Sequence, residues 1–301
     1  MSSSRIVSII GATGDQGSAV LDAVLADGTF TPRAITRNPD SEAALKLKAR
    51  GIEVVKADTL DKASLVAALS GSEAVFGVTV PSFVDYKSEL VQGTNMVDAA
   101  KEVGVKFFVF SSLPSMVEAS GGKYSTHHYE NKAAVEEHLK ASGLANASIL
   151  LGGFLENFWK LGSLQKTPTG WTVPITHYSA ASTQDFTWVK RDVGAAVLAL
   201  LKNYDDPKKG VSGKAYPVIT ACMTYPALAE LTAKAIGAEV TFSSPPTSTI
   251  KEIDDMFACQ SEFPLFKDTP VPNPNLIALG MKFSTVEEFM EVEMKSRYGT
   301  A

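Results

Sequence analysis

The chain has 301 residues, longer than a typical single domain but short enough for one large α/β domain that carries a smaller one. Hydrophobic residues make up 45% of it and charged residues 20%, which is typical of globular proteins rather than of disordered, collagen-like or membrane proteins. The formal net charge of -5 leaves no basic surplus for contacts with nucleic-acid phosphates, so we expect no direct binding of DNA or RNA.

The start of the chain and its cysteines predict a protein of a reducing, aqueous compartment. Met1–Ser4 runs directly into a predicted strand, without the charged and apolar regions of a secretory leader. Ala195–Leu201 is among the longest apolar runs and falls short of the ~18 residues that a membrane helix needs. Cys222 and Cys259 lack the spacing of a zinc or disulfide framework, so we expect both to be buried small residues. The expected location is the cytoplasm, with the nucleus left open, and no membrane association is expected.

Short apolar runs alternate with helical patterns over the first 152 residues. We expect strands, rich in β-branched and aromatic residues, at 5–10, 33–36, 53–57, 74–78, 106–110 and 147–151. Between them we expect a helix that stops at Asp27-Gly28 and helices over 41–50, 61–71, 90–103 and 126–142. Strands that alternate with helices in this way predict a Rossmann-type, doubly wound parallel sheet.

The alternation loosens after Gly152, which predicts a smaller C-terminal domain of mixed α/β structure. We expect a strand at 214–219 and helices at 191–202, 227–236, 248–256 and 284–294. Ser284 and Glu287 have the spacing of a capping box at the start of the last helix. The predicted domains are therefore 1–152, with part of 186–205 packed back on it, and 153–301.

A glycine-rich turn follows the first predicted strand and opens the first helix. It has the GxxGxxG spacing of a dinucleotide fingerprint, in the sequence Gly11-Ala12-Thr13-Gly14-Asp15-Gln16-Gly17. Gly11 lets the chain turn sharply, Gly14 lets backbone N–H groups approach a pyrophosphate, and Gly17 lets the helix pack closely against the sheet. The helix N-terminus adds a partial positive charge. We therefore expect domain 1–152 to bind a dinucleotide through this turn, with Thr13, Asp15 and Gln16 contributing.

The residues after the second predicted strand favour NADP(H) as the cofactor. NAD-specific domains place an acidic residue there to hold the ribose 2′-hydroxyl, whereas this chain has Arg37 and Asn38. A guanidinium makes paired, charge-assisted hydrogen bonds to a 2′-phosphate, which a carboxylate would repel. The alternative is an arginine on a solvated turn. Asp58, at the end of the third strand, is expected either to face the adenine or to start the next turn.

Several segments together resemble one family. The resemblance is to the NmrA-like family of atypical short-chain dehydrogenases/reductases, and it rests on GATGDQG (11–17), TRNP (36–39), KADTLD (56–61), FVFSSL (108–113), YENKAAVEEHL (129–139) and GGFLENF (152–158). It implies a nucleotide domain, a smaller C-terminal domain over a cleft, and NADP(H) bound along the strand ends. Some members of the family transfer hydride from NADPH and others bind the nucleotide and regulate partner proteins, so the fold alone does not decide the function.

The resemblance points to Lys132 as the match of the reductases' catalytic lysine, which would hold the nicotinamide ribose and polarise or protonate a substrate oxygen. The usual acid of short-chain dehydrogenases is a tyrosine four residues earlier, but that position is His128 here. Tyr129, three residues before the lysine, is the candidate for a displaced acid, with His128 as a further candidate. The alternative for Lys132 is an exposed lysine among helix glutamates.

Further candidates follow the predicted strands. The cofactor-binding set is completed by Thr79, Ser111, Lys132, Gly153, Phe154 and Asn157. Ser111 and its neighbour Ser112 end the fifth predicted strand, where the resemblance implies a hydroxyl beside the reacting carbonyl. The alternative is that they are turn residues, since serine is common after a strand. Phe154, Phe158 and Trp159 are expected either to wall an apolar pocket or to belong to the core. No metal site is expected, because His127 and His128 diverge by ~100° on a helix and no further ligand is near them in sequence.

Two functions stay open on the sequence. The first is an NADPH-dependent oxidoreductase that transfers hydride to a small, mainly apolar carbonyl, quinone or enone, which Lys132 and the aromatic-rich cleft favour. The second is a non-catalytic sensor of NADPH and NADP+ that regulates transcription through protein partners, which the missing tyrosine at position 128 favours. The expected partner is accordingly a small-molecule substrate or a regulatory protein, and the oligomeric state is not predicted.

Overall fold

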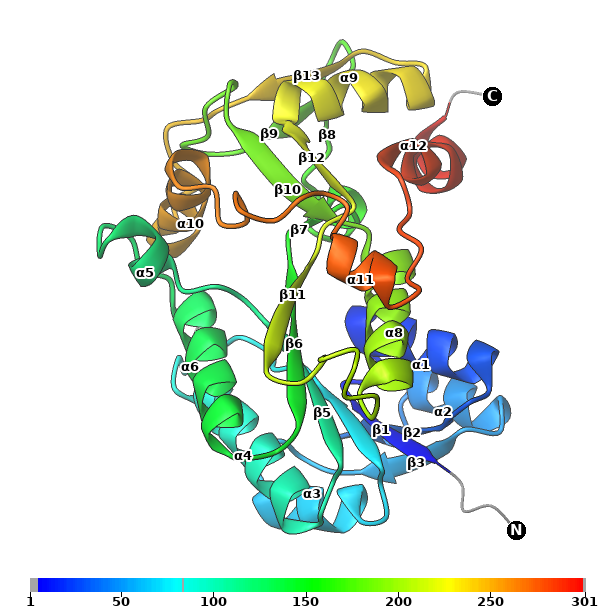
Figure 1. Cartoon of the computed structure of the whole chain (residues 1–301). Coiled ribbons are helices and arrows are strands. Elements are labelled where there is room, and N and C mark those ends of the chain that lie inside the picture. The colour runs from blue at the N-terminus through cyan, green and yellow to red at the C-terminus, as the bar shows by residue number, and fades with distance from the viewer. Residues whose placement is uncertain (1–4, 83, 300–301) are drawn as a thin grey trace.

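The computed structural model of the chain describes residues 5–82 and 84–299, so the predicted absence of a leader at Met1–Ser4 lies outside the described residues (Figure 1). Its centre is a seven-stranded parallel sheet in the order β11-β6-β5-β4-β1-β2-β3. The strands are β1 (Ile6–Ile10), β2 (Thr31–Thr36), β3 (Glu53–Lys56), β4 (Ala74–Gly77), β5 (Phe107–Ser112), β6 (Asn146–Leu151) and β11 (Lys214–Val218). The predicted Rossmann-type fold is confirmed, and the predicted strands lie within a few residues of the observed ones.

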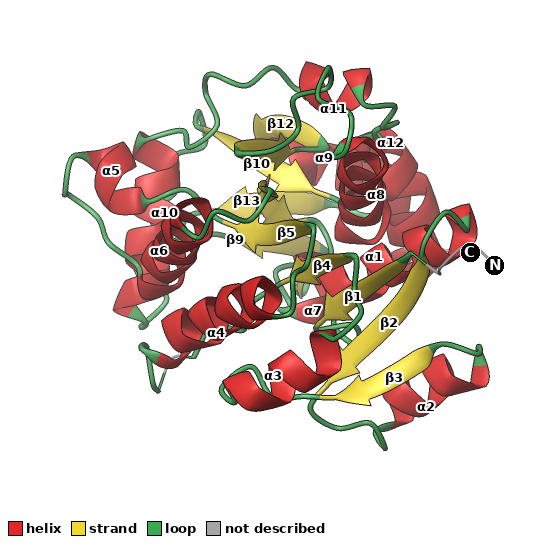
Figure 2. Ribbon diagram, turned by 60° about the horizontal axis from the view of Figure 1, so that its bottom comes forward, coloured by secondary structure: helices red, strands yellow, loops and turns green. Residues whose placement is uncertain are grey.

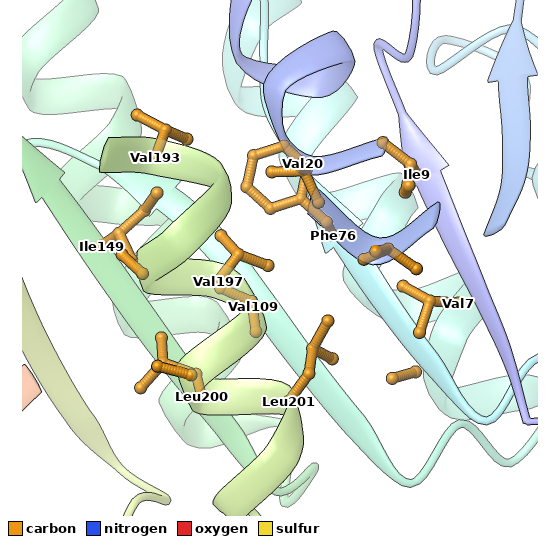
Figure 3. Close-up of a cluster of buried hydrophobic side chains, with 14 of the residues drawn as sticks. Val7, Ile9, Val20, Phe76, Val109, Ile149, Val193, Val197, Leu200 and Leu201 are labelled. Atoms are coloured by element: carbon orange, nitrogen blue, oxygen red, sulfur yellow. The ribbon is translucent and has the colours of Figure 1, made fainter. Parts of the chain in front are cut away.

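Helices cover both faces of this sheet (Figures 1 and 2). One face carries α1 (Asp15–Asp27), α2 (Glu42–Ala49) and α8 (Gly194–Asn203), and the other carries α3 (Lys62–Leu69), α4 (Ser88–Glu102) and α6 (His127–Ala141). Because successive strand residues point to opposite faces, Phe107 and Val109 pack with α1 and α8, whereas Phe108 and Phe110 pack with α3, α4 and α6. Figure 3 shows part of the first cluster, in which Val20 of α1 and Val197 of α8 lie over Ile9 and Val109. These two apolar layers fix the sheet whose strand ends carry the candidate site.

A second region stands over the carboxyl ends of the strands and has its own apolar core (Figure 1). Two three-stranded sheets, β12-β10-β7 and β13-β9-β8, comprise β7 (Gly153–Phe154), β8 (Gln165–Lys166), β9 (Trp171–Pro174), β10 (Thr183–Thr187), β12 (Ala221–Thr224) and β13 (Val240–Ser243). The remaining helices are α5 (Met116–Ser120), α7 (Asn157–Lys160), α9 (Tyr225–Ile236), α10 (Lys251–Glu262), α11 (Pro274–Ala278), α12 (Val286–Phe289) and α13 (Lys295–Tyr298), with π-helical segments η1 (Val189–Val193) and η2 (Met290–Met294). Trp188, Tyr225 and Phe289 are buried at the centre of this region.

The chain passes between the two regions more than once. It leaves the large sheet after β6, returns through η1 and α8 to add β11 beside β6, and leaves again into β12. β11 therefore belongs to the large sheet although it lies beyond residue 152. Later in the chain, Leu276 of α11 packs in the core of the large sheet and Val286 of α12 packs in the core of the second region.

Two local predictions in the second region were wrong. Cys222 is exposed, because it follows buried Ala221 on β12 and its side chain points to the opposite face, whereas Cys259 is buried as predicted. The capping box is formed by Thr285 and Glu288, since the backbone of Ser284 is already held by a hydrogen bond to buried Asp192.

The helix predicted over 248–256 is instead α10, which starts at Lys251 and ends at Glu262. Asp254 accepts hydrogen bonds from Thr247 Oγ1 and Ser248 N at 2.6 and 2.7 Å and holds the segment before the helix as a turn. Across residues 5–82 and 84–299, no helix is long and apolar enough to span a membrane.

Candidate active site

The turn between β1 and α1 is built on close backbone contacts. Gly11 has a φ of +75°, a conformation that favours glycine. A Cβ atom at Gly17 would lie 2.1 Å from Gly11 O, so only glycine lets α1 pack this tightly on the turn. Gly14 N donates to Gly11 O at 2.9 Å. Among the described residues no side chain caps the first turn of α1, so its N–H groups are available to an anion.

Three polar residues of this turn have different surroundings. Thr13 and Asp15 are exposed, and Asp15 forms an ion pair with Lys160 of α7. Gln16 lines the cavity described below. Its Oε1 is buried and accepts no hydrogen bond from any described residue. The turn therefore offers free backbone donors and one unsatisfied acceptor.

The residues after β2 and β3 also differ in their contacts. Arg37 is exposed and, within residues 5–82 and 84–299, has neither an ion pair nor a side-chain hydrogen bond. Asn38 Oδ1 accepts from Asp40 N at 3.1 Å, a local turn contact. Asp58 Oδ1 accepts from Leu60 N at 3.0 Å, so its side chain starts the following turn, one of the two alternatives that the sequence left open. Asn38 and Asp58 are thus partly engaged in local turns, whereas the whole guanidinium of Arg37 is free of contacts with the described residues.

A cavity of about 430 Å³ lies where β4, β5 and β6 end and the second region begins. It is lined by the predicted residues Gln16, Thr79, Ser111, His128, Tyr129, Lys132, Gly153, Phe154 and Asn157. Aromatic side chains form much of the opposite wall, with Phe158, Phe186, Tyr225 and Phe257 contributed by α7, β10, α9 and α10. Trp159 instead stacks on Phe289, with ring centroids 5.9 Å apart, and belongs to the core of the second region. The predicted residues Gly11, Thr13, Gly14, Asp15, Gly17, Arg37, Asn38 and Asp58 lie outside this cavity's lining.

Lys132 is fixed at the base of the cavity rather than exposed. Its Nζ donates to Thr79 Oγ1 at 2.6 Å and to Thr79 O at 3.2 Å, and lies 3.1 Å from Glu89 Oε1. Thr79 Oγ1 in turn donates to Glu89 Oε1 at 2.8 Å. Burial lowers the pKa of Lys132, while the Glu89 carboxylate opposes that shift. Glu89 is only 1% exposed, so it is the buried counter-ion of the ammonium.

Tyr129 and His128 face the same cavity from the first turn of α6. Tyr129 Oη accepts a hydrogen bond from Gln260 Nε2 of α10 at 2.7 Å. Burial raises the pKa of the Tyr129 hydroxyl, so the phenol is protonated at neutral pH. His128 Nδ1 lies 3.4 Å from Glu252 Oε1, and burial lowers the pKa of His128. At neutral pH the site therefore presents a neutral phenol, a neutral imidazole and a paired lysine.

Glu89 and Gln260 are the residues that the sequence did not single out. Each is distant in sequence from the residue that it contacts, Glu89 by 43 positions from Lys132 and Gln260 by 131 from Tyr129. A buried acid near the start of α4 carries no motif of its own, and a polar residue on an amphipathic helix has the pattern of a solvent-facing one. Only the packing of α4 and α10 against α6 identifies them.

Comparisons with known proteins agree with this architecture. The model of the NmrA-like family matches residues 3–297. The NmrA-like family domain-containing oxidoreductase cpsB of Aspergillus campestris is 30% identical over 259 residues, which cover 80% of this chain and 75% of that protein. The related malD of Malbranchea aurantiaca is 33% identical over 203 residues, which cover 65% of this chain and 56% of that protein. The chain spans about half the length of several curated relatives that it matches.

Solved structures share the fold at low sequence identity. NmrA, a negative transcriptional regulator solved in complex with NADP, superposes with a TM-score of 0.80 at 17% identity and covers 98% of this chain and 97% of its own. The NADPH-dependent quinone oxidoreductase QOR2 of Escherichia coli, solved with NADPH, has a TM-score of 0.73 at 24% identity, with 94% and 98% of the two chains covered. Because the family model spans nearly the entire chain, this protein belongs to the NmrA-like family.

Proposed function

We propose that the protein is an NADPH-dependent oxidoreductase that reduces a small, mainly apolar carbonyl, quinone or enone. The observation that carries the proposal is the apolar cavity at the ends of β4, β5 and β6, which has Lys132 and Tyr129 on one wall and aromatic rings on the other. When bound, NADPH supplies the hydride. The names of the curated relatives, which are oxidoreductases, support the same class of activity.

The residues at the nucleotide end fit a dinucleotide phosphate. The free N–H groups of the first turn of α1 and the glycine turn would hold the pyrophosphate. Arg37 would bind the 2′-phosphate, since its guanidinium has no partner among the described residues. Gln16 Oε1 is an unsatisfied buried acceptor that an N–H or hydroxyl group of the nucleotide would supply with a hydrogen bond.

Lys132 is proposed to act through position and charge. Its ammonium is held by Thr79 and Glu89, which fixes a positive charge beside the cavity without leaving it mobile. A fixed charge in a site that excludes water stabilises developing negative charge on an acceptor oxygen at little reorganisation cost. The apolar wall opposite favours acceptors with few polar groups.

The first experiment measures nucleotide binding by tryptophan quenching for the wild type and for Arg37→Ala. Loss of the guanidinium should weaken NADPH binding about 10- to 100-fold, because charge-assisted hydrogen bonds to the 2′-phosphate are lost. NADH binding should not change, since NADH has no 2′-phosphate. Equal loss for both nucleotides would contradict the role of Arg37, and no binding of either would refute the cofactor.

The second experiment follows NADPH oxidation at 340 nm across a panel of quinones, aldehydes and enones, with Lys132→Met as the comparison. Turnover of at least one apolar acceptor, reduced about 100-fold or more by the substitution, is the expected result. Tight NADPH binding with no turnover across the panel would instead favour a non-catalytic NADPH sensor.

A further inference from the structure

A glutamine of α10 determines where the Tyr129 proton points. Gln260 Nε2 donates to Tyr129 Oη at 2.7 Å, and an amide N–H group can only donate. The tyrosine oxygen is therefore the acceptor, and its own proton is directed elsewhere. Within residues 5–82 and 84–299, no group accepts that proton, and Tyr129 lines the cavity. The proton is thus available to an oxygen atom inside the cavity.

The neighbouring ammonium is not available in the same way. An ammonium has three N–H groups, and Lys132 already contacts the backbone oxygen and the hydroxyl of Thr79 and a carboxylate oxygen of Glu89. A substrate oxygen would have to displace one of these buried partners, which costs the desolvation of the group left behind. A bond from Tyr129 to the same oxygen displaces nothing.

The geometry points to Gln260 as the positioning residue that makes Tyr129 the proton donor in the proposed reduction. This inference rests on the proposed function and deepens it, because it selects acceptors that carry a hydrogen-bond-accepting oxygen on an otherwise apolar body. The acceptor carbon gains a hydride, with its two electrons, from NADPH, and the acceptor oxygen gains the proton as the Tyr129 O–H bond breaks. The phenolate oxygen that remains keeps the hydrogen bond from Gln260 and regains a proton from solvent.

Other contacts hold α10 in place, so Gln260 can be changed without releasing the helix. Glu252 accepts from His127 N at 2.8 Å, and Tyr124 Oη donates to Glu262 Oε1 at 2.8 Å. Ser261 Oγ accepts from Ser179 N at 2.9 Å on the other side of α10. Figure 1 shows α10 lying above the start of α6. Substitutions at position 260 therefore test the hydrogen bond rather than the placement of the helix.

Two variants distinguish a hydrogen-bond donor to Tyr129 from a hydrogen-bond acceptor at position 260. Gln260→Glu places a carboxylate there, which accepts the Tyr129 proton and withdraws it from the substrate. Because position 260 is half-buried beside the buried Tyr129, the pKa of the new carboxyl is raised, and below that pKa the protonated carboxyl donates to Tyr129 as the amide does. The methionine side chain of Gln260→Met has a similar length and can neither donate a hydrogen bond to Tyr129 nor accept its proton. We expect kcat of Gln260→Glu to fall about 100-fold at pH 8 and to recover as the pH falls to 5.5, and kcat of Gln260→Met to fall about tenfold at every pH.

Several titratable groups surround the pair, and all are unchanged in these variants. They are His128 and Lys132 on α6, Cys259 on α10, Tyr225 on α9, Asp185 on β10 and Tyr178 before β10. When kcat of each variant is divided by kcat of the wild type at the same pH, the effects of these groups' own titrations cancel. Lys251→Met is the control, since it alters an exposed residue of α10 outside the lining of the cavity and should leave the pH profile as in the wild type.

A binding readout tests the inference without turnover. The probes are 2-acetonaphthone and 2-ethylnaphthalene, which have similar shapes and differ by one carbonyl oxygen, titrated by tryptophan fluorescence. The wild type and Lys251→Met should bind the ketone about fivefold more tightly than the hydrocarbon. Gln260→Glu should lose this preference at pH 8 and regain it at pH 5.5.

The outcomes separate this inference from the proposed function. An equal preference for the ketone in the wild type and both Gln260 variants at both pH values would overturn the role of Gln260, as would a pH-independent loss in Gln260→Glu. A wild type that turns over no acceptor, yet shows the ketone preference and its pH-dependent loss, would overturn the reductase function and leave Tyr129 as an oxygen-recognising donor.

Discussion

The proposed nucleotide end of the candidate site is built from backbone, and the proposed substrate end is built from side chains. At the first, a continuous turn over residues 11–17 packs so tightly that a Cβ atom at Gly17 would meet a carbonyl oxygen. At the second, Phe186, Tyr225 and Phe257 reach one cavity from three separate elements. Backbone contacts leave no alternative conformation, whereas a wall of side chains can repack. Single substitutions should therefore cause large losses of stability and nucleotide binding at the first end, and smaller changes in acceptor preference at the second.

The largest effect is expected from Gly17→Ala. The new Cβ would lie 2.1 Å from Gly11 O and 2.8 Å from Ala12 Cα, so the turn and α1 must move apart. We expect a loss of about 4 kcal/mol or more in the free energy of unfolding, together with loss of measurable NADPH binding. Urea unfolding and tryptophan quenching measure the two effects.

Gly14→Ala is the matched control in the same turn. A Cβ there would lie 3.4 Å from Gly11 O, and Gly14 has a φ of -91°, which other residues adopt readily. Its stability should change by less than about 1 kcal/mol, while NADPH binding weakens if the pyrophosphate approaches this backbone. A Gly17→Ala variant as stable as Gly14→Ala would contradict the backbone account of this end.

An intermediate effect is expected from Glu89→Gln, at the junction of the two ends. It leaves the ammonium of Lys132 buried without its counter-ion, which should cost about 3 kcal/mol at neutral pH. Burial lowers the pKa of Lys132 in the folded state, and Glu89, which opposes that shift, is removed. The unfolded chain then binds the proton of Lys132 more tightly than the folded chain does. The free energy of unfolding of Glu89→Gln should therefore rise with pH, and its deficit relative to the wild type should shrink above neutral pH.

Unfolding at several pH values checks this prediction, and a double variant provides its control. Glu89→Gln combined with Lys132→Met removes both charges, so most of the lost stability should return. A double variant less stable than Glu89→Gln alone would show that the pair matters for packing rather than for charge.

The smallest effect is expected from Phe257→Ala, at the side-chain end. Phe257 is partly buried on α10 and faces the cavity, so its loss enlarges the pocket without breaking a hydrogen bond. We expect KM to fall severalfold for acceptors bulkier than those that the wild type prefers, because about 1–3 kcal/mol of discrimination depends on such contacts. NADPH affinity should stay unchanged. A parallel loss of NADPH affinity would show that the two ends are not separate.

The same contrast explains what the sequence could predict. Strands such as Phe107–Ser112 are continuous buried runs, and the turn at Gly11 follows one directly, so local pattern predicts both. The short strands β7 and β8 have two residues each and are set by pairing with distant partners, which leaves no periodicity to find. β11 was predicted as a strand, but its place beside β6 depends on the return of the chain through α8.

The candidate site divides in the same way. Lys132 and Tyr129 could be proposed because they lie three residues apart on one helix, in a segment that resembles the family, and the cavity brings both together, although their roles stay predictions. Glu89 and Gln260, which set the charge and the hydrogen bond of those residues, come from other helices and lie in no motif. Local spacing in the sequence predicts which side chains face a site. Tertiary packing then decides the protonation states of those side chains and the direction of their hydrogen bonds.

The repeated passage of the chain between its two regions limits how such a protein can be re-engineered. The connections after β6, before α8, after β11 and after α11 all link the two apolar cores. A graft of the cavity-forming region from a relative would need several joints, each with its own register, instead of one fusion point. New acceptor preferences are therefore more accessible through in-place changes such as the one at Phe257 than through recombination of whole segments.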